Sequence, residues 1–139
     1  MSVRVFEAIV SLWDANSLGD TFGGGIHFRK APASTSFPYV VMVPVSAARS
    51  GRTSASKYID QRVQLSVFYK AADSVDPVSQ LGTLMRTLDA VMDDAELSIP
   101  ASEGHVFSLD AESEMVHEDP APDVYHGTLN YMVRRRKPS

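Results

Sequence analysis

The residues of this chain that could do chemistry are few, and they do not form a recognisable catalytic or metal-binding set. His117, Glu118 and Asp119 are metal-ligand types in succession. Neighbouring residues of a strand or turn cannot converge on one ion, and no second histidine follows at the spacing of a zinc-binding helix. The four histidines stand apart, with no nucleophile and carboxylate in the order that a triad requires. The sequence therefore predicts no catalytic residue, no metal and no cofactor.

Composition narrows the possible classes of protein. The chain has no cysteine, which excludes disulfides, thiolate catalysis and zinc sites built on sulfur. A net charge of −4 argues against a general nucleic-acid-binding protein. The first residues lack the long apolar core of a signal peptide, and no segment is apolar over the length needed to cross a bilayer. We expect no membrane partner.

Three consecutive glycines at residues 23–25 could cradle a phosphate only under specific conditions. A phosphate-binding loop needs a strand before it, a helix after it and a lysine that follows. A predicted helix precedes these glycines instead. The better interpretation is a flexible turn.

Two basic segments are candidates for contact with a partner. Arg49, Arg52 and Lys57 lie in a stretch of Ser, Ala and Gly over residues 46–57, which predicts a long connection between two strands. This candidate docking loop could meet the acidic rim of a partner, or it could simply be solvated. The second segment, residues 134–137, ends the chain and is weak evidence for nucleic-acid binding, since no aromatic residues interleave it.

Three acidic residues alternate with apolar ones near the C-terminal end. Asp110, Glu112 and Glu114 have the parity opposite to that of Leu109 and Ala111, which predicts that the acids share the solvent face of one strand. Either they are an ordinary solvated surface, or they face a channel. The sequence does not decide between these two interpretations.

Periodicity predicts the elements that carry these residues. Apolar and polar residues alternate over 61–69, 107–115 and 125–133, as in strands with one buried face. Helical spacing predicts a first helix that ends just before Gly19 and a second that begins at Pro77. Residues 26–29 suggest a short strand. The order helix, strand, strand, helix, strand, strand predicts an α+β fold, an antiparallel β-sheet with two α-helices packed on one face, in a single domain over residues 1–139.

Residues 37–45 form a run that is apolar on both faces of its predicted strand. The helices can cover only one of them, and a neighbouring subunit is the natural cover for the other. Val41, Val43 and Val45 are therefore the candidate subunit interface. Pro44 lacks a backbone donor and predicts a bulge or a sheet edge at this point.

Four features in order carry a family resemblance: a short N-terminal helix, the FPYVV segment at residues 37–41, the QLSVFY segment at 64–69 and the GTLNY segment at 127–131. With these the chain resembles the small tail-terminator proteins of long-tailed bacteriophages, also called tail-completion or head-to-tail joining proteins. The resemblance implies a structural protein without catalytic residues. It implies a ring, usually a hexamer, that caps the completed tail tube and joins it to the head.

The resemblance also implies partners and a location. The partners would be further copies of the chain, the tail tube protein, a head-completion or connector protein, and genomic DNA that passes through the lumen without specific binding. The protein would be made in the host cytoplasm and would lie at the head-proximal end of the tail in the virion. Two alternatives stay open: a neck or connector adaptor between portal and tail, and a small α+β enzyme or ligand-binding domain.

Overall fold

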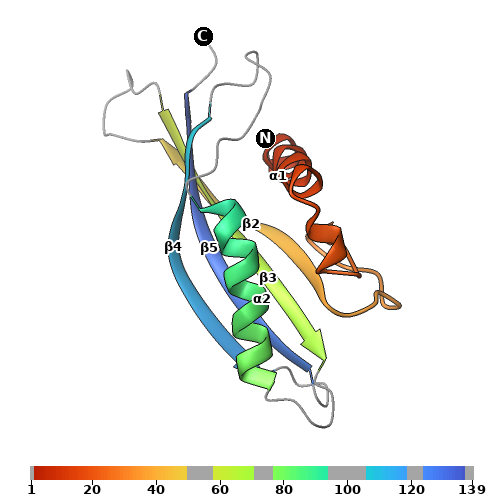
Figure 1. Ribbon diagram of the computed structural model, residues 1–139. Helices are drawn as coiled ribbons and strands as arrows, with labels where there is room; N and C mark the ends of the chain where they lie inside the picture. Colours follow the sequence, from red (N-terminus) through yellow and green to blue (C-terminus); the bar gives the residue numbers. More distant parts are fainter. Residues whose placement is uncertain (1, 50–57, 71–76, 94–105, 119–123, 137–139) are drawn as a thin grey trace.

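The computed structural model describes residues 2–49, 58–70, 77–93, 106–118 and 124–136 (Figure 1). Along the chain the elements are α1 (Ser2–Ala15), a 3-10 turn η1 (Leu18–Asp20), β1 (Ile26–Phe28), β2 (Tyr39–Arg49), β3 (Tyr58–Lys70), α2 (Pro77–Met92), β4 (Val106–Glu118) and β5 (Val124–Arg136). The five strands form one sheet in the order β1-β2-β3-β5-β4. The predicted α+β class and element order are confirmed.

All strand pairs are antiparallel except one. The short β1 runs parallel to β2, with Ile26 paired to Val40. β3 and β4 are both antiparallel to β5, which lies between them, so α2 connects two strands that run in the same direction. The expected antiparallel sheet therefore acquires a parallel edge, because the chain returns through residues 29–38 before β2 begins.

Both helices lie on the same face of the sheet, as predicted (Figure 1). The core between the layers is fully apolar at its centre, where Ile9 and Phe22 meet Met42, Leu65 and Leu88, all with no exposed surface. Each strand contributes alternate residues to it, as the period of two requires. The opposite face of the sheet has no helix over it among the described residues.

α2 contacts β5 closely at Gly127. A side-chain carbon at this position would collide with Met85 of α2, so the absence of one lets the helix approach the strand. Further along the same pair of elements, the Tyr131 hydroxyl donates a hydrogen bond of 2.6 Å to Asp89. Asp89 is half-buried and ties the helix to β5.

Several predicted boundaries can be compared with the structure. α2 begins at Pro77, as predicted, because proline fits the first helical position. The register of β2 against β3 shifts between Pro44 and Ser46, which confirms the predicted bulge. α1 ends at Ala15 rather than before Gly19, and Ser17 takes the left-handed conformation (φ 54°) there. No helix of the described part is long and apolar enough to cross a membrane.

Candidate assembly surface

The helix-free face of the sheet is the main candidate for contact with other molecules. Between Arg62 and Lys70 of β3, which have the parity opposite to the core, it carries Tyr39, Val41 and Val43 of β2 and Gln64, Ser66 and Phe68 of β3. Each of these side chains is apolar, aromatic or uncharged. An uncharged stretch of this size in the middle of a sheet face is unusual for a surface that only meets water.

The three valines of the predicted interface do not have the same exposure. Val41 is 7% exposed and Val45 is 57% exposed, while Val43 is half-buried. Among the residues whose side chains the structure describes, Phe37, just before β2, is the other large apolar one that is exposed, at 37%. The apolar surface that needs a cover therefore lies at Phe37 and toward the Val45 end, and Val41 already has its cover within the subunit.

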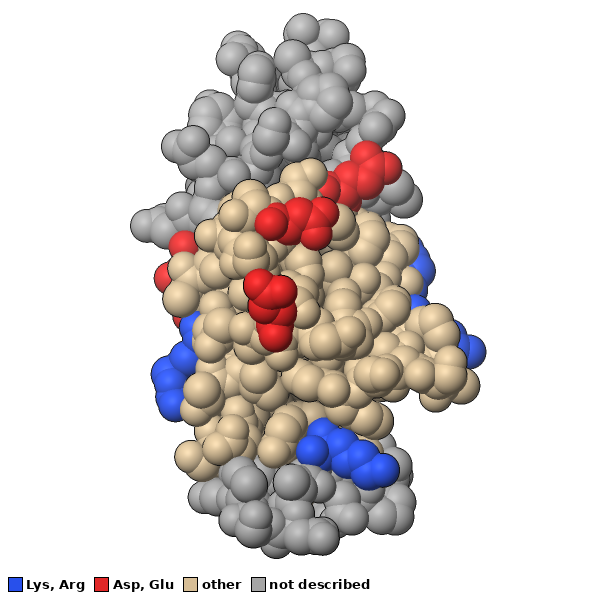
Figure 2. All heavy atoms as spheres, turned by 45° about the vertical axis from the view of Figure 1, so that its right-hand side comes forward, with Lys and Arg blue, Asp and Glu red and all other residues tan. Residues whose placement is uncertain are grey.

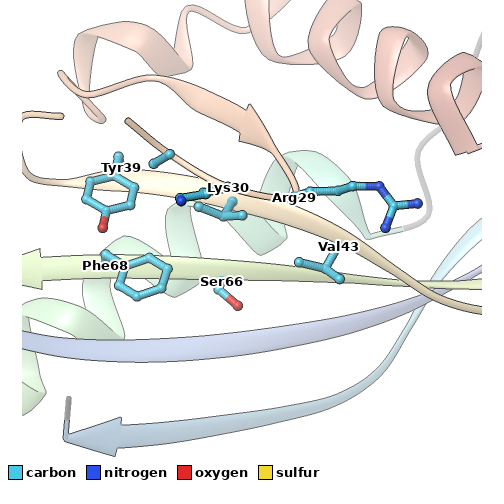
Figure 3. Close-up of a pocket in the computed structure, with 8 residues that line it drawn as sticks. Arg29, Lys30, Tyr39, Val43, Ser66 and Phe68 are labelled. Atoms are coloured by element: carbon cyan, nitrogen blue, oxygen red, sulfur yellow. The ribbon is translucent and has the colours of Figure 1, made fainter. Parts of the chain in front are cut away.

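That cover comes from the segment that follows β1. Residues 29–31 form one wall of a surface pocket of about 310 Å³, whose floor is made by β2 and β3 (Figure 3). The pocket is lined by Arg29, Lys30, Ala31, Tyr39, Val41, Val43, Ser66 and Phe68. Figure 3 shows Tyr39 and Phe68 together at one end, while the Arg29 side chain extends away from them. The pocket is thus apolar and aromatic within, with cationic residues at its rim.

An aromatic row crosses three strands beside this pocket. Tyr39 on β2 stacks on Phe68 on β3, with ring centres 4.9 Å apart, and Phe68 stacks on His126 on β5 at 5.1 Å. The register pairs the same residues directly across the strands. Phe37 extends the row, with its ring 5.2 Å from that of Tyr39. Such pairs contribute about 0.5–1.5 kcal/mol each beyond their buried area.

Sequence analysis did not identify the aromatic row. The sequence did indicate that Tyr39 and Phe68 each lie on the helix-free face, because of their parity within their own strands. Which residue meets which depends on the register, and the register is not visible in a single strand. The row became evident only from the paired strands.

The glycine triplet is a closely packed turn rather than the flexible turn expected. The Gly24 amide donates to the Pro38 carbonyl at 3.0 Å, and Gly25 adopts φ +78°. A side-chain carbon at Gly24 would collide with the carbonyl oxygen of Ser36 and approach Tyr39 Cβ to 2.7 Å. His27 Nε2 lies 2.8 Å from the Gly24 carbonyl oxygen. The turn therefore fixes the chain beside Tyr39 at the edge of the helix-free face.

The candidate docking loop is placed only in part. Arg49 is the last residue of β2, and its backbone pairs with Ile59 of β3. Residues 46–49 thus extend a strand where a connection was expected, because β3 is long enough to pair with them. Arg52 and Lys57 lie outside the described residues, so the docking role stays a prediction.

The alternation that suggested an acidic stripe is interrupted in β4. Asp110 pairs with Met132 of β5, whereas Glu114 pairs with Leu129, and the register shifts between Ala111 and Ser113. Met132 and Leu129 differ by an odd number of positions, so they belong to opposite faces of β5. The inference that Asp110, Glu112 and Glu114 share one face therefore loses its basis. Their channel-facing role stays an untested prediction.

No group of three or more histidine or acidic residues that could hold a metal ion occurs within the described ranges. Figure 2 shows acidic side chains gathered on one half of the face it presents, with basic ones at its margins. The acidic residues Glu7, Asp14 and Asp20 are exposed on α1 and η1, so the helical layer carries negative charge.

Comparison with known proteins agrees with this picture. A solved chain from "Virion of native gene transfer agent (GTA) particle" shares the fold, with a TM-score of 0.79 over 97% of this chain and 96% of that one, at 15% sequence identity. No match was found among curated proteins. The family model described as Tail completion protein gp17 matches residues 8–136, which include part of α1, all of α2 and all five strands. The chain therefore belongs to the tail completion protein gp17 family and is a structural component of a bacteriophage-type virion tail.

Proposed function

We propose that the protein forms a ring, most simply of six subunits, that caps the head-proximal end of the tail tube and joins it to the head. Genomic DNA passes through the centre of the ring. The tail tube protein and a head-completion or connector protein are its neighbours. Family membership supports a role at tail completion, and the uncovered apolar surface of the sheet supports assembly.

The observation that carries the proposal is the exposure of Val45 and Phe37 on a sheet whose other face packs against both helices. Leaving apolar area in water costs about 25 cal/mol per Å². A second subunit that covers this surface removes the cost. The second subunit can cover this surface with a different surface of its own. The contact is then heterologous, and it repeats from subunit to subunit until the ring closes.

Two further surfaces have roles in this proposal. The part of the candidate docking loop beyond β2, with Arg52 and Lys57, would dock on an acidic rim of the tube or of the connector, where opposite charge favours encounter and orientation. Of Asp110, Glu112 and Glu114, those that the shifted register of β4 leaves on the lumen side would face the lumen. The family is a structural one, and we propose no reaction for this chain.

The test of ring formation is a charged substitution at the exposed end of the valine series. Val45→Asp should abolish the ring and leave the folded monomer intact, because the side chain is 57% exposed in the monomer. Light scattering of the purified protein measures the size of the assembly, and electron micrographs sorted by symmetry show whether it is a ring. Gln80→Glu, which adds the same charge at an exposed position of α2, should assemble like the wild type.

Two results would contradict the proposal. Val45→Asp could assemble as well as the wild type, or the wild type could stay monomeric both alone and with purified tail tubes. A wild type that forms rings only on a portal would support the adaptor between portal and tail instead.

A further inference from the structure

The sheet brings together two basic segments that are far apart in the sequence. Arg49 at the end of β2 pairs with Ile59 of β3, and Ile59 pairs in turn with Arg135 of β5. Tyr58, one position earlier on β3, pairs with Arg136. The start of the first basic segment and the whole described part of the second therefore lie at the same end of the sheet.

Arg62 and Arg134 belong to the same region. Arg62 is exposed on β3 and pairs with Met132, two positions before Arg134 on β5. By parity, Arg62, Arg134 and Arg136 are positions of the helix-free face. We call the group of Arg49, Arg62, Arg134, Arg135 and Arg136 the arginine end.

The local charge of this region is opposite to that of the protein. Only two acidic positions, Asp60 and Asp110, lie on the same stretches of the described strands, against five arginines. The chain as a whole has a net charge of −4. The positive charge is thus concentrated at one end of a protein that is otherwise acidic.

The geometry of the sheet spaces these positions closely. Neighbouring strands lie about 4.8 Å apart, and alternate residues of one strand are about 7 Å apart. Figure 1 shows the ends of β2, β3, β4 and β5 extending past the C-terminal end of α2. All five basic positions are arginine, whose planar guanidinium suits phosphate oxygens through paired hydrogen bonds.

From this placement we infer that the arginine end contacts the phosphate backbone of duplex DNA, without sequence preference, as the DNA passes through the assembled ring. The inference rests on the proposed function, which brings a duplex to the centre of the ring. A ring repeats the arginine end once per subunit, so the contacts add around the duplex. Contacts of this kind release counterions and allow the duplex to slide.

The experiment measures binding of the assembled wild-type protein to a short duplex of mixed sequence, by fluorescence anisotropy at about 50 and 200 mM salt. The double variant Arg134→Gln, Arg136→Gln should bind about tenfold more weakly at low salt. Its plot of log affinity against log salt should be shallower by about 0.9 for each phosphate that the variant no longer neutralises. Light scattering confirms that the variant still assembles.

Two companion variants separate charge from structure. Arg134→Lys, Arg136→Lys keeps the charge and should keep the salt slope. Lys30→Gln, Lys70→Gln removes the same charge from exposed positions away from this end, since Lys70 pairs with Val124 at the opposite end of β5. It should change the affinity less than twofold.

The inference is overturned if the wild type shows no salt-dependent binding, or if the Lys30→Gln, Lys70→Gln control weakens binding as much as the arginine variant. It is also overturned if the wild type binds no DNA and the arginine variant fails to assemble, since the arginine end would then meet an acidic protein surface. Rings that bind no DNA would leave the proposed function standing. Arginine-dependent binding by a protein that never forms rings would uphold the DNA contact and reject the ring.

Discussion

At the scale of single residues, the positions that matter most are those where the backbone approaches another group too closely for a side chain. Gly24 is the clearest case, because the neighbouring group is the backbone carbonyl of Ser36 and cannot rotate away. At Gly127 the neighbour is the Met85 side chain, which can move. The two glycines therefore differ in how much a substitution should cost.

Gly24→Ala should lower the free energy of unfolding by about 1–3 kcal/mol, as expected for overpacking against a rigid group. The adjacent Gly23 is the matched control, since nothing lies within 4 Å of a side-chain carbon there. Gly23→Ala should change the stability by less than about 0.5 kcal/mol. Urea unfolding of the two variants compares them directly, and equal stabilities would show that the turn adjusts freely.

A second residue-scale prediction concerns the hydrogen bond between α2 and β5. Tyr131→Phe removes the hydroxyl that donates to Asp89 and should destabilise the fold by about 1 kcal/mol, without opening a cavity. Tyr125→Phe, on the same strand and at the sheet end away from the arginines, is the control and should cost less. Thermal unfolding of both variants provides the measurement. A larger loss for Tyr125→Phe would contradict the assigned role of the bond.

At the scale of elements, α2 holds β3, β5 and β4 together, because it packs on all three. Its buried stripe of Leu81, Met85, Leu88 and Met92 follows the helical spacing, while Arg86 and Ala90 are exposed between them. The stripe faces the core, and the intervening positions face water.

Leu88→Ala should therefore destabilise the protein by about 2–5 kcal/mol, since it empties a fully buried site at the centre of the core. Arg86→Ala, two positions earlier and exposed, should change the stability by no more than about 0.5 kcal/mol. Chemical denaturation measures both stability losses. They can be compared if the free energy of unfolding falls with denaturant concentration at the same slope in all variants. Similar losses at both positions would mean that α2 is not packed as described.

At the scale of the whole molecule, the apolar surface and the arginine end predict different responses to salt. The surface around Val45 and Phe37 is apolar, whereas the arginine end acts through charge. Raising the salt concentration from about 0.1 to 1 M shortens the Debye length from about 10 to 3 Å. It weakens contacts between exposed charges but does not weaken apolar burial.

We therefore expect the ring to keep its size in about 1 M salt while DNA no longer binds, as measured by light scattering and anisotropy on the same sample. Dissociation of the ring in high salt would show that charge, rather than apolar contact, joins the subunits. Retention of DNA in high salt would contradict a backbone contact by the arginine end.

The sequence by itself determined which segments become helices and strands, and which face of each is buried. The stripe of α2, its start at Pro77, the alternation in β3 and β5 and the bulge at Pro44 were all predictable, because each depends on residues close together in the chain. The resemblance carried by these segments also identified the family correctly.

Only the tertiary structure decided which positions meet across the sheet. Tyr39, Phe68 and His126 stack because three strands pair in one register, and Arg49 and Arg135 pair with the two sides of Ile59 for the same reason. Alternation within a strand is local, whereas register is set by pairing with distant segments. A single irregularity, as between Ala111 and Ser113, reverses the faces of every residue beyond it, which is why the acidic stripe could not be predicted from parity alone.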